Sequence, residues 1–146
     1  MDVRDGMNRR VVTVGPGHTL REAARKMTEK GVGAAVVIDE EAPGPRIVSE
    51  RDILTSLGRG EDPDGERVGD HMSDSVISAA PDWSLERAAM EMSRRHVRHL
   101  VVVERGELIG ILSMRDIVRV WTTEGATSGM TPPEEEGATE SEAAPA

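Results

Sequence analysis

Two short motifs in this sequence place a serine three residues before an aspartate. They are Ser49-x-x-Asp52 and Ser113-x-x-Asp116, and each follows an apolar run that predicts a β-strand. A serine and an acid at this spacing are typical of a helix N-terminus, where their side chains bind the first free backbone N–H groups. The positive helix end keeps such a carboxylate ionised, and the same N–H groups can bind an anion. Each motif therefore fits both a helix cap and a ligand site, and one residue pair can serve both roles.

Histidines offer a second kind of chemistry. His96 and His99 form an H-x-x-H pair, and His71 is a possible third ligand for zinc. No cysteine or carboxylate stands at ligand spacing from the pair, so we predict no metal site. The run GVGAAV at 31–36 superficially suggests a dinucleotide loop, but it follows a predicted helix and leads into a strand, the reverse of the required order. We interpret it as a helix stop.

Catalytic constellations are not recognisable in the sequence. The chain has no cysteine, which excludes disulfides, thiolate metal ligands and cysteine nucleophiles. It also has no nucleophile–base pair at a recognisable spacing and no phosphate-binding loop. We therefore predict that the protein is not an enzyme.

The elements that position these motifs occur twice. Residues 68–104 align with residues 3–39, and IVSERDI at 47–53 then aligns with ILSMRDI at 111–117. A repeat of about sixty residues is too long for a solenoid unit. Each copy is instead half a domain, so we expect the copies to pack face to face, with the functional surface where they meet.

Within each copy the pattern predicts strand, helix, strand, strand and helix. The first strand is the β-branched pair at 11–12 or 76–77, and a helix begins after Thr19 or Ser84, with apolar residues at i, i+3, i+4 and i+7. The runs at 34–38 and 100–103 are apolar at consecutive positions, which predicts strands buried on both faces. Second strands at 46–48 and 108–112 lead into the last helices.

Composition and charge limit the partners. The net charge is −9, and residues 122–146 contribute −6 of it through six glutamates, with no Lys or Arg. We predict that this acidic tail is disordered. Without a basic stripe, and with only two aromatic residues, no nucleic-acid partner is expected. Because no apolar run reaches the length of a membrane span and no signal peptide is recognisable, we predict a cytoplasmic protein without membrane partners.

With this order of elements the chain resembles a pair of CBS domains, the arrangement called a Bateman module. The resemblance rests on the duplication, on the Ser-x-x-Asp that opens each last helix, and on RHLVVV at 98–103 followed by GELIGILSMRDI at 106–117. It implies an α/β fold with repeat 1 at 1–58, a linker at 59–67 and repeat 2 at 68–121. Overall the chain is similar to small stand-alone prokaryotic CBS-pair proteins.

The resemblance also implies a ligand, because the family binds AMP, ADP, ATP, NAD or S-adenosylmethionine in two clefts between the repeats. A carboxylate has two acceptor oxygens, which match the two hydroxyls of a ribose. In the family pattern, the Asp52 cleft would consist of Ser49, Asp52, Ser78, Val97, Arg98 and His99. The Asp116 cleft would consist of Ser113, Asp116, Thr13, Gly33 and Ala34.

We expect the two clefts to differ, because repeat 1 has Gly33 and Ala34 where repeat 2 has Arg98 and His99. The planar guanidinium of Arg98 suits a phosphate, so we predict a phosphorylated ligand in the Asp52 cleft. The Asp116 cleft, lacking both groups, would be empty or accept a less charged ligand. Neighbouring strand residues point to opposite faces, so Arg98 and His99 can reach one ligand only where the strand is irregular.

The predicted function is that of a regulatory module that senses an adenine nucleotide and requires no cofactor. The resemblance implies a homodimer, and regulation implies a protein partner that the sequence does not identify. A ligand-free module for protein interaction or dimerisation is the alternative, and an enzyme acting on nucleotides is a more distant one.

Overall fold

The computed structural model describes residues 1–42, 44–73 and 76–124 of the chain. Most of the predicted disordered tail, residues 125–146, lies outside the described residues. Residues 122–124 form the end of the last helix.

Both repeats have the predicted order of elements, which confirms the α/β fold. Repeat 1 contains β1 (Thr13–Val14), α2 (Leu20–Lys30), β2 (Ala34–Val37), β3 (Arg46–Ser49) and α3 (Glu50–Gly58). Repeat 2 contains β4 (Ser78–Ala79), α4 (Leu85–Arg95), β5 (His99–Glu104), β6 (Glu107–Ser113) and α5 (Met114–Glu124). The short helix α1 (Val3–Gly6) opens repeat 1 ahead of β1, and the 3-10 helix η1 (Val68–Asp70) opens repeat 2 ahead of β4. In the described part of the chain, no helix has the length and apolar character needed to cross a membrane.

Local signals set the helix ends as expected. The Thr19 hydroxyl accepts a hydrogen bond from the Glu22 N–H at the start of α2. Gly31 ends this helix in the left-handed conformation, at φ 66°, which glycine adopts without the steric cost of a Cβ. This confirms that GVGAAV begins with a helix stop. His96 takes the same conformation at the end of α4.

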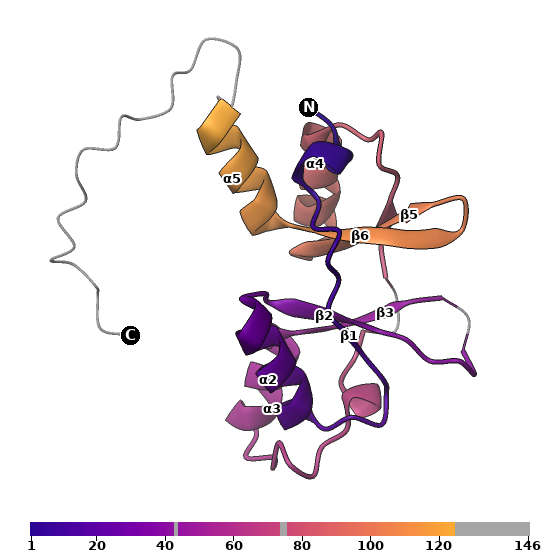
Figure 1. Ribbon diagram of the computed structural model, residues 1–146. Helices are drawn as coiled ribbons and strands as arrows, with labels where there is room; N and C mark the ends of the chain where they lie inside the picture. Colours follow the sequence, from indigo (N-terminus) through magenta and orange to yellow (C-terminus); the bar gives the residue numbers. More distant parts are fainter. Residues whose placement is uncertain (43, 74–75, 125–146) are drawn as a thin grey trace, which may run out of the picture.

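Each repeat forms a three-stranded sheet in which the first two strands are parallel and the last two antiparallel. The two sheets face each other at the centre of the molecule, and the helices α2 to α5 lie on the outside (Figure 1). The first strands begin two residues later than predicted, at Thr13 and Ser78. Val12 and Ile77 already accept backbone hydrogen bonds from Val36 and Val101, but the regular ladder starts only after them.

The alternation of side chains along β2 shows how the core is divided. Ala34 and Val36 belong to an apolar cluster between the two sheets, together with Ile47, Val101 and Ile111. Ala35 and Val37 instead pack under the helices of their own repeat. All four β2 residues are buried, which confirms a strand covered on both faces.

The first segment of each repeat packs on the other repeat. Val3 of α1 is fully buried in the core of repeat 2, where its N–H donates to the Trp83 carbonyl. Val68 of η1 is fully buried in the core of repeat 1, and its N–H donates to the His18 carbonyl. Each hydrophobic core is therefore completed by a residue from the start of the other repeat.

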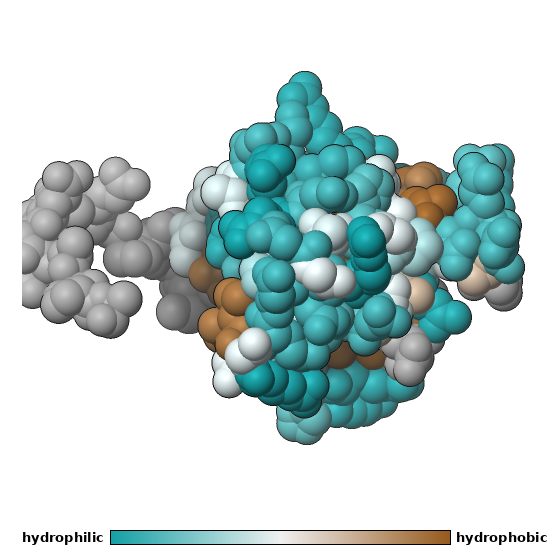
Figure 2. Space-filling model, turned by 90° about the horizontal axis from the view of Figure 1, so that it is seen from below, coloured by the Kyte–Doolittle hydropathy of each residue, from teal (hydrophilic) through white to brown (hydrophobic). Residues whose placement is uncertain are grey.

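The outer end of repeat 1 presents a largely hydrophilic surface, with apolar patches near its edges (Figure 2). The large apolar side chains exposed on the last helices are Leu54 and Leu57 of α3 and Met114 and Val118 of α5.

Candidate functional site: two clefts between the repeats

Both Ser-x-x-Asp motifs lie where a strand passes directly into a helix. Ser49 ends β3 on the face that Ile47 turns toward the other repeat, and Ser113 ends β6 on the corresponding face of repeat 2. Asp52 Oδ2 accepts hydrogen bonds from the Ser49 N–H at 2.7 Å and from its hydroxyl at 3.0 Å. Asp116 Oδ2 accepts the same pair from Ser113, both at 2.8 Å. The capping interpretation of the motifs is thus confirmed.

The cap engages only one oxygen of each carboxylate. Arg119 donates a hydrogen bond of 3.4 Å to Asp116 Oδ1, from a largely exposed guanidinium. Within the described part of the chain, Asp52 Oδ1 accepts no hydrogen bond from another side chain or from the backbone. Each aspartate therefore keeps one acceptor oxygen that a ligand can reach or compete for.

The Asp52 cleft contains most of the residues predicted for it. Ser49, Asp52, Val97, Arg98 and His99 line a hollow of about 200 Å³. The additional lining comes from both repeats and includes Ile47, Glu50, Arg51, Ser73, Val76, Ile77 and His96. Ser78 is not among these residues.

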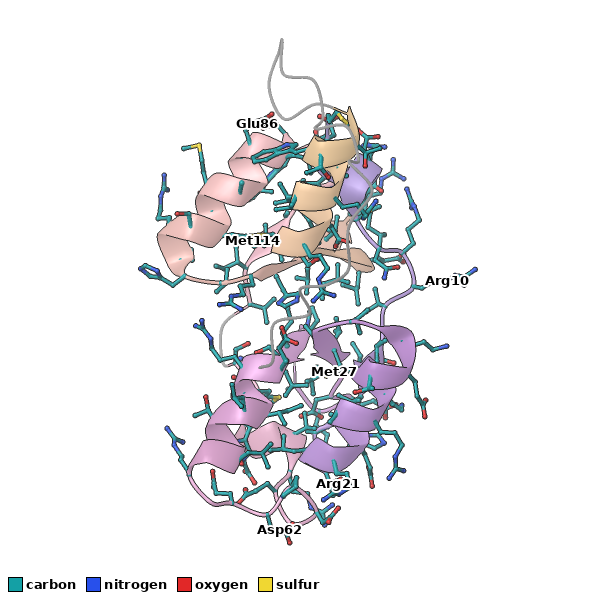
Figure 3. All side chains as sticks on the ribbon, turned by 90° about the vertical axis from the view of Figure 1, so that its left-hand side faces the viewer. Arg10, Arg21, Met27, Asp62, Glu86 and Met114 are labelled. Carbon is teal, nitrogen blue, oxygen red and sulfur yellow. The ribbon has the colours of Figure 1, made fainter. Side chains whose placement is uncertain are left out.

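The Asp116 cleft is larger, at about 540 Å³. Ser113, Asp116, Gly33 and Ala34 line it as predicted, whereas Thr13 does not. Residues outside the predicted set also line this cleft: Asn8, Lys30, Gly31, Val32, Glu50, Arg98, His99, Ile111, Met114, Arg115 and Val118. Met114 marks the end of α5 that faces repeat 1 (Figure 3).

The register of the parallel strands explains why Thr13 and Ser78 lie elsewhere. Thr13 pairs with Val36 and Ser78 with Val101, two residues along from the cleft positions Ala34 and His99. Thr13 consequently lines a separate surface hollow with Lys26, and Ser78 lines another with Arg46. The residues that line the Asp52 cleft near β4 are Val76 and Ile77, which lie just before this strand.

Arg98 and His99 line both clefts, so the expectation that the Asp116 cleft lacks them is wrong. His99 is the first residue of β5 and shares the face of Val101, which packs against repeat 1. Arg98 lies just before the strand, so its side chain does not follow the alternation of side chains between the two faces of the sheet. The start of β5 is therefore the irregular point that lets two neighbouring residues face the same space.

The Asp116 cleft has more cations than the Asp52 cleft, whereas the sequence predicted the phosphate-binding cation in the Asp52 cleft. In the Asp116 cleft, Lys30, Arg98 and Arg115 face two carboxylates, those of Glu50 and Asp116. In the Asp52 cleft, two cations, Arg51 and Arg98, face the carboxylates of Glu50 and Asp52. Lys30 could be noticed in the sequence only as a cation at the end of a helix, because its distance from Asp116 depends on the packing of the two repeats.

The surroundings of His99 in the clefts change the pKa of its imidazole. Burial lowers its pKa below the ordinary value for histidine, while the charges of Glu50 and Asp116 act in the opposite direction. Arg115 and Arg98 add to the lowering. The imidazole is therefore biased toward its neutral form, in which one ring nitrogen accepts and the other donates.

The H-x-x-H pair does not gather a metal site. His96 and His99 both line the Asp52 cleft. In the residues that the structure describes, however, the sole trio of candidate metal ligands within 4.8 Å of one another lies elsewhere, in the linker region.

The fold and the paired clefts define a tandem CBS module, and the chain belongs to the CBS-domain family. The family model for the CBS domain matches residues 1–59 and 68–122, one match for each repeat. Among solved structures, the chain is similar to the CBS domain protein PAE2072 from Pyrobaculum aerophilum, which was solved in complex with AMP. The two are 33% identical with a TM-score of 0.74, and the match covers 88% of this chain and 100% of the other.

Curated relatives are similar to this chain over most of its length. The chain is 35% identical to the CBS domain-containing protein YhcV of Bacillus subtilis, over 88% of this chain and 92% of that protein. It is 34% identical to the uncharacterized protein MK0525 of Methanopyrus kandleri, over 82% of this chain but only 62% of that protein. The shared part is therefore the CBS module.

Proposed function

We propose that this chain is a regulatory module that binds an adenine nucleotide between its two repeats, with the Asp116 cleft as the principal site. The observation that carries the proposal is the composition of this cleft. It combines a carboxylate acceptor held by a helix cap with three cations, in a hollow of about 540 Å³. Small-molecule sites typically occupy about 300–1,000 Å³, so the space suits a whole nucleotide.

The lining residues divide into groups that suit the parts of a nucleotide. Asp116 Oδ1 would accept hydrogen bonds from the ribose hydroxyls in place of the long contact from Arg119. Arg98, Lys30 and Arg115 would bind the phosphates, because charge-assisted hydrogen bonds to phosphate are stronger than neutral ones. The apolar lining, which includes Val32, Ile111 and Val118, would contact the base. The AMP complex of PAE2072 supports an adenine ligand for a chain of this kind.

The Asp52 cleft is a second candidate site. Its uncovered acceptor oxygen suits a ribose, as the sequence analysis proposed, but its hollow of about 200 Å³ is smaller than typical small-molecule sites. A nucleotide there would require the repeats to move apart. We therefore rank it below the Asp116 cleft, which reverses the preference drawn from the sequence.

Regulation follows from the position of the clefts. Lys30 and Glu50 belong to repeat 1, whereas Arg98 and Asp116 belong to repeat 2. A ligand that contacts both repeats binds with an affinity that depends on their relative orientation, and so it shifts the population of orientations. The module would transmit this shift to a protein partner, and the proposal assigns the chain no catalytic role.

We also propose that the chain forms a homodimer through its last helices. Leu54 is 69% exposed and Val118 52% exposed, and Leu57 and Met114 add further apolar surface on α3 and α5. Analytical ultracentrifugation tests this directly. A dimer that dissociates in Leu54→Ser but persists in Met90→Ser, which removes an exposed apolar side chain from α4, supports the assignment. A monomeric wild-type chain refutes it.

The nucleotide proposal is tested by isothermal titration of the full chain with AMP, ADP, ATP, NAD and S-adenosylmethionine in turn. Asp116→Asn keeps an acceptor for the Ser113 cap but removes the charge, and we expect it to weaken binding about 10- to 100-fold. Asp52→Asn makes the same change in the other cleft, and Asp82→Asn is the control, at an exposed position that lines neither cleft.

Each outcome decides between functions. Saturable binding lost in Asp116→Asn alone supports the proposed site, and loss in Asp52→Asn alone returns the assignment to the smaller cleft. Flat titrations of a folded protein with every ligand favour the alternative, a ligand-free interaction module. Sustained turnover of ATP or NAD by purified protein would instead identify an enzyme.

A further inference from the structure

A cluster of three titratable side chains lies at the linker, away from both clefts. Glu61 and Glu66 belong to the segment between α3 and η1, and His71 follows η1 directly. One ligand atom from each of the three lies within 4.8 Å of the other two. The labelled neighbour Asp62 marks this region at the end of repeat 1 that is farthest from repeat 2 (Figure 3).

One carboxylate oxygen of the cluster has no partner. Glu61 Oε1 is buried and forms no hydrogen bond within the described part of the chain. Leaving a carboxylate oxygen buried without a donor or a cation costs free energy, so its presence calls for a physical reason. In the same part of the chain, no Lys or Arg forms an ion pair with Glu61 or Glu66, and the nearby Arg21 pairs with Asp64 instead.

The second carboxylate is ionised and points at the histidine. Glu66 Oε2 lies 3.0 Å from His71 Nε2, and both side chains are mostly buried. The hydrogen bond from His71 lowers the pKa of Glu66, burial acts in the opposite direction, and the neighbouring Glu61 side chain adds to the lowering. The two carboxylates and the imidazole thus place three potential ligand atoms close together.

The backbone holds the three residues in place without any ligand. The Glu61 N–H donates to the Ser56 carbonyl, and the Glu66 N–H donates to the Asp62 carbonyl. The Glu66 carbonyl accepts from Leu20 at the start of α2, and the His71 N–H donates to the Val68 carbonyl. The cluster therefore joins the end of α3, the start of α2 and the segment that brings Val68 into the core of repeat 1.

We propose that Glu61, Glu66 and His71 form a binding site for one divalent transition-metal ion, with Zn²⁺ preferred. One imidazole nitrogen and two carboxylate oxygens are a donor set that zinc accepts, with a fourth position for water. Mg²⁺ and Ca²⁺ prefer oxygen ligands alone and are disfavoured by the imidazole. The ion would neutralise the buried Glu61 oxygen and fasten the linker to repeat 1, so its role is structural and independent of nucleotide binding.

The test uses the full-length protein, loaded with ZnCl₂ and dialysed, with bound metal measured by mass spectrometry and the melting temperature by calorimetry. We expect about one Zn²⁺ per chain and a higher melting temperature with ZnCl₂ than with MgCl₂ or CaCl₂. Glu61→Gln and His71→Asn each remove a direct ligand, so each should weaken Zn²⁺ binding strongly. The loss should exceed the roughly 10- to 100-fold seen when a residue that only orients a metal ligand is changed. Without metal, Glu61→Gln should be as stable as the wild type or more stable, because it removes the unpaired charge.

Two control variants separate this site from other histidines. His18→Asn alters an exposed imidazole beside Glu22, and His96→Ala breaks the H-x-x-H pair of the Asp52 cleft. Both should bind Zn²⁺ as the wild type does. The proposal is overturned if the wild type keeps no zinc and its melting temperature is unchanged, which would mean that the three side chains only share protons. Loss of zinc in His96→Ala with full binding in Glu61→Gln would overturn it equally.

Discussion

Glu50 covers Gly33 at the boundary between the two clefts. The Glu50 N–H donates to the Gly33 carbonyl at 2.9 Å, and a Cβ at position 33 would come within 3.1 Å of the Glu50 carboxylate. In repeat 2 the equivalent backbone bond joins the Met114 N–H to the Arg98 carbonyl. The glycine in repeat 1 thus makes room for the carboxylate of Glu50, whereas repeat 2 has Arg98 at the glycine position and Met114 at the acid position. Because Glu50 and Arg98 each line both clefts, this difference contributes one negative and one positive charge to each.

Glu50→Gln should strengthen the binding of phosphorylated ligands, because it removes a negative charge that faces the phosphates. The gain is expected to be about two- to fivefold, since exposed charge interactions contribute up to about 1 kcal/mol. Titration with ADP, compared with adenosine, measures the effect, and adenosine affinity should not change. Glu86→Gln, on the outer part of α4 (Figure 3), is the matched control. Weaker ADP binding in Glu50→Gln would mean that Glu50 binds the ligand itself.

Much of the fold could be predicted because it depends on local patterns. The strands at 34–38 and 100–103 are recognisable from consecutive apolar residues, and the last helices from Ser49 and Ser113, whose caps the structure confirms. These signals need only the residues within one element.

The composition of the clefts depended on relationships that no local pattern contains. Thr13 and Ser78 were assigned to clefts that they do not line, because the register of the parallel strands places them two residues too far along. Arg98 was assigned to one cleft and lines two, because β5 begins only after it. The grouping of His71 with Glu61 and Glu66 likewise depends on how the linker packs against α2.

Arg98→Ala should weaken the binding of phosphorylated ligands in both clefts, since Arg98 lines each of them. A charge-assisted hydrogen bond contributes about 1.5–3 kcal/mol, so we expect a loss of about 10- to 100-fold. Lys30→Ala is the comparison for the Asp116 cleft alone, and Arg51→Ala for the Asp52 cleft alone. In a titration that resolves two sites, Arg98→Ala should affect both, and an effect on one site only would contradict the shared wall.

Val68→Ala should destabilise both repeats together, because the repeats exchange the segments that complete their cores. Removing two fully buried methyl groups is expected to cost about 1–3 kcal/mol of unfolding free energy. Urea unfolding followed by tryptophan fluorescence gives the decisive readout. Both tryptophans pack in repeat 2, whereas Val68 lies in the core of repeat 1.

A single shifted transition in both fluorescence and circular dichroism is the expected result for Val68→Ala. Val3→Ala should behave in the same way from the other core, and Met90→Ala, at an exposed position of α4, should change stability little. Fluorescence that keeps its wild-type midpoint in Val68→Ala, while circular dichroism shifts, would show that the repeats unfold independently.

Phosphorylated ligands should bind more tightly as the pH falls through the pKa that His99 has in the complex, because the imidazole is then protonated beside the phosphate. Burial lowers its pKa in the free protein, with Arg115 and Arg98 acting in the same direction and Glu50 and Asp116 against it. A bound phosphate adds negative charge beside the imidazole and raises this pKa, so binding takes up protons in the interval between the free and bound values. Each unit of that rise corresponds to about a tenfold gain in affinity below the interval. The gain is lost as the pH rises through the bound-state pKa.

The lowered pKa of His99 also determines how the stability of the free protein depends on pH. Because folded His99 holds its proton less tightly than the unfolded chain does, its contribution to stability is present above the ordinary histidine pKa and decreases as the pH falls below it. Titration of ADP in buffers of different ionisation enthalpy measures proton uptake directly. ADP itself takes up some protons on binding. His99→Gln should abolish the proton uptake beyond that amount, and His18→Gln should retain it. Equal uptake in wild type and His99→Gln would remove His99 from the phosphate site.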